Sequence, residues 1–207
     1  MEFATDWNVS ASDSASFLKA AQKAGTSPNG VFGFRIMWEN VADLLAELAN
    51  LHPGLQGPAL LAAAFGRCRF VFLHRRDDVA QAVSRLIAEQ TRHWHTIDGT
   101  PQIEGSAQKP RSYDHDQIAA YRSEATQNSR SWLDWFDQNG IKAVSVAYED
   151  LASEPEIALV SLIKELGLEL PADCFLQITT KRLADSGNLA WCARYRQEAG
   201  LPPTKQN

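Results

Sequence analysis

The sequence has no long apolar run. No stretch of its 207 residues is apolar enough to span a bilayer, and the first ten, MEFATDWNVS, do not have the basic-then-apolar pattern of a signal peptide. We therefore predict a protein that is not embedded in a membrane and that is located in the cytoplasm.

Cysteine is also scarce, with only Cys68, Cys174 and Cys192 in the whole chain. Their odd number and wide spacing argue against a disulfide framework, and no CxxC pair or Cys/His cluster offers a metal site. We expect reduced thiols in or near the core and no bound metal.

Positive charge is not in excess, because the formal net charge is −5. This charge gives no indication of electrostatic capture by nucleic acid or by an anionic membrane, so any bound anion must be held by a few local cations. The length, with 44% hydrophobic and 22% charged residues, is typical of a soluble globular protein. We expect a single domain over residues 1–207.

Three short runs rich in β-branched and aromatic residues predict buried strands at Val31–Met37, Arg69–Leu73 and Ala143–Ala147. Helical patterns between them predict a parallel sheet with helices on both faces. The expected fold class is α/β, with three α/β/α layers around a central, mainly parallel sheet.

The helices are predicted from apolar residues that recur every three or four positions. They lie at Ser14–Ala24, Val41–Leu48, Val79–Trp94 and Ile118–Phe136, and a fifth begins at a capping box in Ser153–Glu156 and stops at Gly167. The stretch Thr96–Tyr113 has no periodicity and is predicted to be an irregular loop.

Two arginines follow the second predicted strand and precede a helix. Ligands of parallel α/β sheets bind at the carboxyl ends of strands, where helix N-termini favour anions. Arg76 in this place offers a bidentate cation for a phosphate, with Arg75 beside it. Ser84 follows eight residues after Arg76 and could donate to the same anion. The alternative is that these residues only lie on a solvated helix start.

Four segments, taken together, resemble landmarks of the bacterial trehalose 2-sulfotransferase family. They are GVFGFRIMW at Gly30–Trp38, FLHRRDDVAQAVS at Phe72–Ser84, YEDL at Tyr148–Leu151 and WCARYR at Trp191–Arg196. They occur in the family's order, and the resemblance covers nearly the whole chain. It implies a sulfotransferase-like fold and transfer of a sulfuryl group from 3′-phosphoadenosine-5′-phosphosulfate (PAPS) to trehalose or a similar sugar.

The resemblance also implies roles for particular residues. Arg76 and Ser84 would bind the 3′-phosphate of PAPS, with Arg75 as the alternative arginine. Tyr148 would lie near the adenine, although a strand-end core tyrosine is an equally good interpretation. His95 could reach a sugar hydroxyl, or it is a surface residue at a helix end.

The chain departs from the family at its start. Family members begin with a strand, a loop that wraps the 5′-phosphosulfate and a helix, and no such segment or G-x-x-x-x-G-K-[ST] run occurs here. We therefore expect a sheet that lacks its first strand, with a gap at its centre. Glu2, followed by Phe3, stands where the family has its catalytic base, and it could equally be a frayed terminal carboxylate.

The expected partners also follow from the resemblance. They are a sugar or glycolipid acceptor and a second copy of the chain in a homodimer, but no nucleic acid. Two other interpretations remain open. One is a non-catalytic remnant of the fold that binds a nucleotide bisphosphate or a protein partner. The other, a P-loop nucleotide kinase, ranks last because its phosphate loop and lysine are absent.

Overall fold

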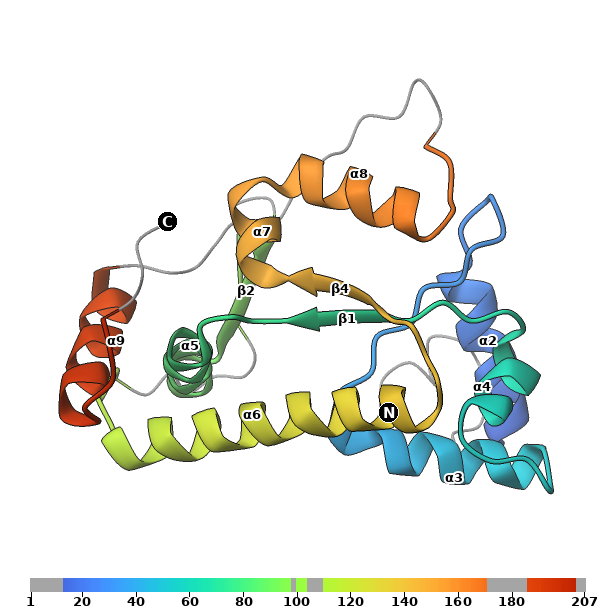
Figure 1. Cartoon of the computed structure of the whole chain (residues 1–207), viewed down its shortest axis with the longest axis horizontal. Helices are drawn as coiled ribbons and strands as arrows, with labels where there is room; N and C mark the ends of the chain where they lie inside the picture. The colour runs from blue at the N-terminus through green and yellow to red at the C-terminus, as the bar shows by residue number, and fades with distance from the viewer. Residues whose placement is uncertain (1–12, 98–99, 104–109, 171–185, 204–207) are drawn as a thin grey trace. The chain divides into compact units, whose positions relative to one another are not determined.

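The computed structural model of the chain describes residues 13–97, 100–103, 110–170 and 186–203 (Figure 1). Its contacts fall into two compact units, Met1–Cys68 and Arg69–Asn207, which we describe separately. The expected single domain stays a prediction. No helix in the described ranges is long and apolar enough to cross a membrane.

The described part of the first unit is helical. It contains the helices α2 (Ser14–Gly25), η1 (Trp38–Asn40), α3 (Val41–Leu51) and α4 (Pro58–Phe65). Asp13 is the N-cap of α2, because its side chain accepts a hydrogen bond from the backbone N–H of Ser16 at 3.1 Å. The apolar periodicity that predicted α2 and α3 is confirmed.

The predicted strand at Val31–Met37 is wrong. Its only ladder contact among the described residues is an isolated bridge between Phe32 and Thr26. Phe32 and Phe34 instead stack on Phe65 of α4, with ring centroids 5.7 and 6.0 Å away. A strand needs a partner for its N–H and C=O groups as well as a favourable composition, and here the aromatic rings contact a helix instead.

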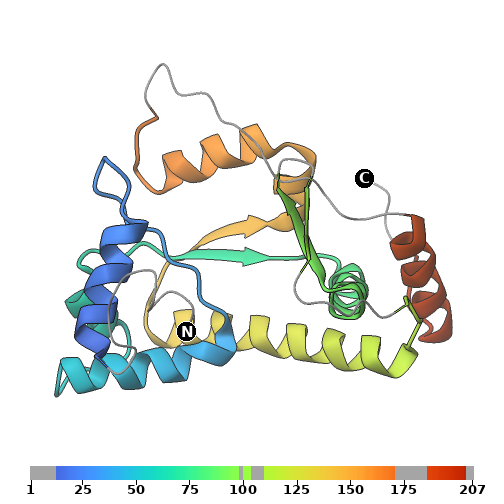
Figure 2. The ribbon, with the colours of Figure 1, turned by 180° about the vertical axis from the view of Figure 1, so that it is seen from behind.

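The second unit contains a small parallel sheet made of β1 (Val71–His74) and β4 (Val144–Ala147). The register pairs Val71 with Val144 and His74 with Ala147. The two strands are direct neighbours (Figures 1 and 2), so the gap expected at the centre of the sheet does not lie between them. The parallel pairing of these two predicted strands is confirmed.

One face of this sheet packs on the long helix α6 (His115–Gln138). Phe70 and Phe72 point to this face, where their rings meet those of Trp135 and Phe136 edge-on at 5.8 and 6.0 Å. Alternate β1 residues point to the other face, and there Leu73 is 54% exposed. The described residues thus form a mostly helical α/β structure with a small sheet, and the three-layer arrangement stays a prediction.

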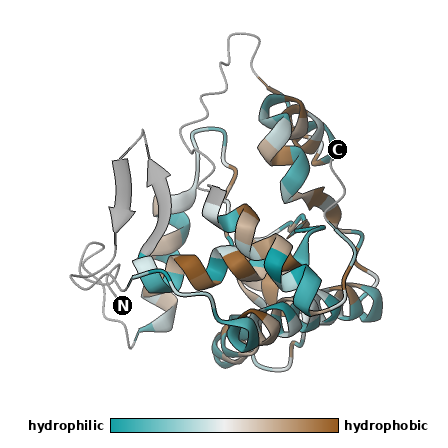
Figure 3. Cartoon of the chain, turned by 90° about the vertical axis from the view of Figure 1, so that its left-hand side faces the viewer, coloured by the Kyte–Doolittle hydropathy of each residue, from teal (hydrophilic) through white to brown (hydrophobic). Residues whose placement is uncertain are grey.

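The core of the second unit lies where α5 (Asp78–Thr91) packs against α6 and α9 (Ser186–Glu198). Ribbon colours in Figure 3 change from brown to teal along the helices, as expected for amphipathic segments. The buried cluster comprises Val79, Ala82, Val83, Leu86, Ile87, Ile118, Cys192 and Tyr195. Burial also raises the pKa of the Cys192 thiol to about 11. The prediction of a thiol in the core is confirmed at this position.

The predicted end of one helix is wrong. α5 ends at Thr91 and is followed by Arg92 in a left-handed conformation, with φ 57°. Trp94 therefore lies outside the helix, in β2 (His93–Ile97), which pairs antiparallel with β3 (Thr100–Ile103). The predicted irregular loop thus begins within a hairpin.

The helices after β4 are α7 (Tyr148–Ser153) and α8 (Pro155–Glu165). Gly167 follows α8 with φ 68°, which confirms the predicted stop. The capping box is wrong, because the Ser153 hydroxyl donates to the Asp150 carbonyl at 3.3 Å and so belongs to the end of α7. α8 begins instead with a proline in its first turn, where a missing N–H costs nothing.

Candidate functional site

The candidate site lies at the carboxyl ends of β1 and β4. His74 and Ala147 face each other in the register, so the residues that follow them meet at one edge of the sheet. Arg75 and Arg76 lead from β1 into α5, and Tyr148 begins α7 directly after β4. Tertiary structure therefore brings together two motifs that are more than 60 residues apart in the sequence.

Arg76 is held by Asp150. Its two terminal nitrogens donate to the two carboxylate oxygens at 2.7 and 2.5 Å, in a bidentate pair. The side chains are 52% and 53% exposed, so the pair is screened by solvent. The hydrogen bond raises the pKa of Arg76 and lowers that of Asp150, so both groups are charged at neutral pH.

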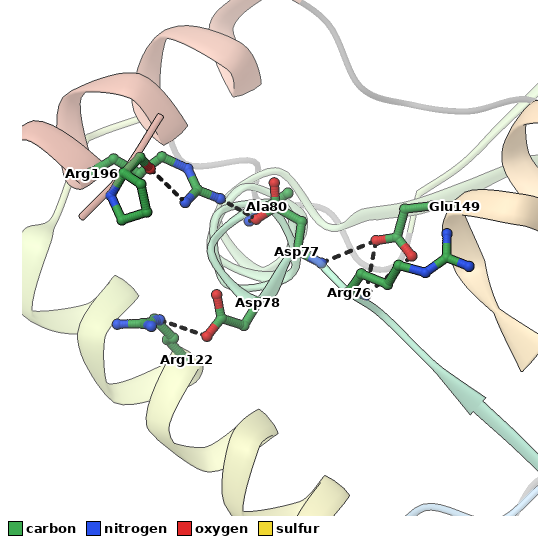
Figure 4. Close-up of polar contacts among 8 residues, drawn as sticks. Arg76, Asp77, Asp78, Ala80, Arg122, Glu149 and Arg196 are labelled. Atoms are coloured by element: carbon green, nitrogen blue, oxygen red, sulfur yellow. Dashed lines mark hydrogen bonds and ion pairs between the residues drawn. The ribbon is translucent and has the colours of Figure 1, made fainter. Parts of the chain in front are cut away.

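Glu149 holds the backbone at the same junction (Figure 4). Its carboxylate accepts hydrogen bonds from the backbone N–H groups of Arg76, at 3.1 Å, and Asp77, at 3.2 Å. Partial burial raises the pKa of Glu149, but these N–H bonds, the N–H of Glu149 itself and the charge of Arg75 lower it, and the net shift is downward. The ionised carboxylate therefore fixes the turn between β1 and α5.

Arg75 lies over the ring of Tyr148. Its guanidinium carbon is 3.8 Å from the ring centroid, a cation–π geometry. Arg75 also lines an open groove of about 650 Å³ beside the sheet and α6. Other lining residues include Phe72, His74, Leu133, Lys142 and Ser145. The His74 Nε2 atom is 3.1 Å from the Ser145 hydroxyl, which fixes the imidazole at the groove.

Two further arginines hold the start of α5 (Figure 4). Asp77 caps the helix by accepting from the backbone N–H of Ala80 at 2.8 Å, and it also accepts from Arg196 of α9 at 2.6 Å. Asp78 accepts from Arg122 of α6 at 2.8 Å. The helix that follows the arginine pair is thereby fixed to both of its packing partners.

Some predicted site residues come together and others do not. Arg75, Arg76 and Tyr148 lie at the same edge of the sheet, after the ends of β1 and β4. Ser84 lies two turns inside α5 and is half-buried, and no hydrogen bond among the described residues joins it to Arg76. A joint anion site of Arg76 and Ser84 therefore stays a prediction. Glu2 lies outside the described residues, and His95 is described only by its backbone position in β2.

The sequence interpretation missed Glu149 and Asp150 as partners of the arginines. A signal was present, because two acidic residues follow one predicted strand closely and two basic residues follow another. Opposite charges at the carboxyl ends of adjacent parallel strands are expected to pair. Among the described residues, no three His, Cys, Asp or Glu side chains form a group that could hold a metal ion.

The low pKa of Glu149 predicts a pH-dependent stability. An acid whose pKa is lower in the folded state stabilises the fold above its unfolded pKa, and this contribution is lost as pH falls through the folded pKa. We expect the difference in unfolding free energy between the native protein and Glu149→Gln to shrink between about pH 6 and pH 3. Urea titrations across this range measure it. Glu169→Gln, at an exposed glutamate outside the helices, controls for charge removal alone, and a pH-independent difference for Glu149→Gln would contradict the expectation.

The parallel strands β1 and β4, with arginines at their carboxyl ends, define the chain as an α/β protein. Proteins of this class bind anionic ligands at this edge of the sheet. The model of the Stf0 sulphotransferase family matches residues 4–198, and the chain belongs to this family. The family predicted from the four motifs is thus confirmed.

Two relatives are similar over most of the chain. The trehalose 2-sulfotransferase of Mycobacterium tuberculosis (strain ATCC 35801 / TMC 107 / Erdman) is 32% identical over 189 residues, which cover 86% of this chain and 67% of the relative. The trehalose 2-sulfotransferase of Mycolicibacterium smegmatis (strain ATCC 700084 / mc(2)155) is 30% identical over 188 residues, covering 87% of this chain and 67% of the relative.

Proposed function

We propose that the chain transfers a sulfuryl group from PAPS to a hydroxyl of trehalose or a similar sugar, as part of a cytoplasmic homodimer. Membership of a sulphotransferase family supports the reaction, and the names of the two relatives support the acceptor. The observation that carries the proposal is the meeting of Arg75, Arg76 and Tyr148 at the carboxyl edge of β1 and β4.

The nucleotide part of the donor would bind at this edge of the sheet. Guanidinium groups bind phosphate through charge-assisted hydrogen bonds, so the arginine pair would take the 3′-phosphate, with Ser84 as an additional donor. Tyr148 would lie near the adenine. Because Arg75 covers one face of the Tyr148 ring, the base would contact the ring edge or the opposite face.

The chemistry resembles phosphoryl transfer. The acceptor oxygen forms a bond to sulfur while the bond from sulfur to the 5′-phosphate oxygen breaks, and positioning and electrostatic stabilisation dominate. A base takes the proton of the acceptor hydroxyl, and the proposed base is Glu2, with His95 beside the sugar. The bisphosphate leaves with the negative charge on its 5′-phosphate, while the arginine pair would hold its 3′-phosphate.

Removing both arginines tests the proposed donor site. We expect Arg75→Ala/Arg76→Ala to weaken binding of adenosine 3′,5′-bisphosphate roughly ten- to hundredfold, because a hydrogen bond to a charged group contributes about 1.5–3 kcal/mol. Isothermal titration calorimetry measures this affinity. The matched control Lys164→Ala/Arg194→Ala removes the same charge from α8 and α9.

The possible outcomes separate the interpretations. Unchanged affinity in the double arginine variant would show that the site is misplaced, and absence of bisphosphate binding by the native chain would contradict the proposed donor. Sulfated trehalose, detected by mass spectrometry after incubation with PAPS and trehalose, would support the complete proposal. Bisphosphate binding without sulfation of any sugar offered would instead favour a non-catalytic remnant.

A further inference from the structure

A second open cavity lies on the long helix α6. Its volume is about 400 Å³, and it is lined by one face of α6 together with Tyr195 of α9. Neither arginine of the proposed donor site lines it. Figure 4 shows Arg122, which does, on the opposite side of the start of α5 from Arg76. The cavity is therefore separate from the proposed donor site.

Polar residues of α6 form a row along this cavity. Arg122 and Arg130 mark the two ends of the row. Between them lie Ser123, Thr126 and Gln127. These positions share one face of the helix, because residues three or four apart are neighbours on its surface. With the rise of an α-helix, the two arginine backbones are about 12 Å apart along the helix axis. The cavity thus has a guanidinium group at each end and amide and hydroxyl groups between them.

The two guanidinium groups differ in how their charge is compensated. The Nε–H of Arg122 donates to Asp78 at 2.8 Å. Partial burial lowers the pKa of Arg122, but Asp78 and Tyr195 raise it, and the net shift is upward, so this arginine is charged. Arg130 is exposed, and no hydrogen bond or ion pair joins it to another described residue. Because no described carboxylate lines the cavity, Arg130 supplies an uncompensated positive charge there.

The groups between the two arginines can bind hydroxyls. Ser123 and Gln127 are exposed, and an amide side chain both donates and accepts hydrogen bonds. The Gln127 amide donates to the Ser131 hydroxyl at 3.4 Å, a long bond that a ligand can replace. By contrast, the Thr126 hydroxyl donates to the Arg122 carbonyl at 2.9 Å, so its proton is already used within the helix. Gln127 is thus the main uncharged group that is available to a ligand.

We propose that this cavity binds a small hydroxylated molecule with one anionic ester group, of the class of sugar sulfates and sugar phosphates. Arg130 holds the ester, because a guanidinium group binds a tetrahedral anion through two parallel N–H bonds. Gln127 and the terminal nitrogens of Arg122 bind hydroxyls of the ligand, since Asp78 takes only the Nε–H of that arginine. This binding site goes beyond the proposed sulfuryl transfer and does not depend on it.

Nuclear magnetic resonance of the arginine side chains tests the site directly. The Nε–H signals of Arg122 and Arg130 in ¹⁵N-labelled protein are assigned by comparison with Arg122→Lys and Arg130→Lys. Glucose 6-sulfate or glucose 6-phosphate should shift both signals, with roughly tenfold higher affinity than inorganic sulfate, because the sugar hydroxyls add hydrogen bonds. Neutral glucose should shift neither signal at the same concentrations. Binding of either ester supports the proposal, and the tighter of the two identifies the preferred anion.

Substitutions within the cavity provide a second test. Arg130→Ala should weaken binding of glucose 6-sulfate at least about tenfold, because it removes the uncompensated charge. Gln127→Glu adds a carboxylate to the cavity with almost no change in side-chain size, and it should weaken binding by a similar factor. Both residues are exposed, so we expect the variants to fold, and thermal unfolding checks this.

The controls make similar changes of charge outside the cavity. Lys164→Ala removes a positive charge from α8, and Gln138→Glu adds a carboxylate at the exposed end of α6. Each should change the affinity for glucose 6-sulfate by less than about twofold. If Gln138→Glu weakened binding as much as Gln127→Glu, the effect would come from the overall charge, and the proposed site would be wrong.

Three further results would overturn the proposal. The first is an Arg130 signal that neither ester shifts, and the second is inorganic sulfate that binds as tightly as the esters. The third is loss of ester binding in Arg75→Ala/Arg76→Ala with unchanged binding in Arg130→Ala, which would place the ester at the donor site. Failure of this proposal leaves the proposed function intact, because Arg130→Ala is expected to bind adenosine 3′,5′-bisphosphate normally.

Discussion

Replacement of Ile118 by alanine is expected to lower the free energy of unfolding by about 2–5 kcal/mol. The Ile118 side chain is 0% exposed and belongs to the cluster that joins α6 to α5 and α9. Truncation removes buried methyl and methylene groups and leaves a cavity, because the surrounding helices relax only in part. Urea denaturation followed by circular dichroism measures the change.

A matched control lies on α8. Ile157 is 65% exposed, so Ile157→Ala should change the unfolding free energy by no more than about 0.5 kcal/mol. If the two variants were equally stable, the α5–α6–α9 interface would not be the core of the second unit. The comparison holds the chemistry of the substitution constant and varies only burial.

Replacement of Arg196 by alanine is expected to destabilise the protein by about 3 kcal/mol. The Arg196 and Asp77 side chains are 13% and 19% exposed, and their ion pair joins α9 to the start of α5. Removing the arginine leaves a largely buried carboxylate without its cation. Breaking a buried ion pair typically lowers the free energy of unfolding by about 3–5 kcal/mol. We expect the lower end of this range, because Asp77 still accepts the N–H of Ala80.

A second arginine of the same helix is the control for this prediction. Arg194 pairs with Glu198 across one helical turn, and its side chain is 58% exposed. Arg194→Ala should therefore leave the midpoint of thermal unfolding nearly unchanged. A large shift for Arg194→Ala, or none for Arg196→Ala, would mean that burial of the pair does not determine its contribution.

The segment around Arg75 and Arg76 shows which features of the site can be predicted from the sequence. A strand followed by Arg75 and Arg76 and then by a helix was predictable, because the three parts are contiguous and each has a local signal. The Tyr148–Leu151 segment was also recognisable. The ion pair of Arg76 with Asp150 was not predictable, because the proximity of these two side chains results from the pairing of β1 with β4.

By itself the sequence determined the family, the helices α3, α5 and α6 within a few residues, and the two strands that pair. Helical periodicity and strand composition are local properties, so neighbouring residues carry them. Only the tertiary structure decided that Val31–Met37 does not pair as a strand, that Trp94 lies in a hairpin and that Asp150 holds Arg76. These outcomes depend on which distant groups supply hydrogen-bond partners and packing surfaces, and that information is fixed only when the chain is folded.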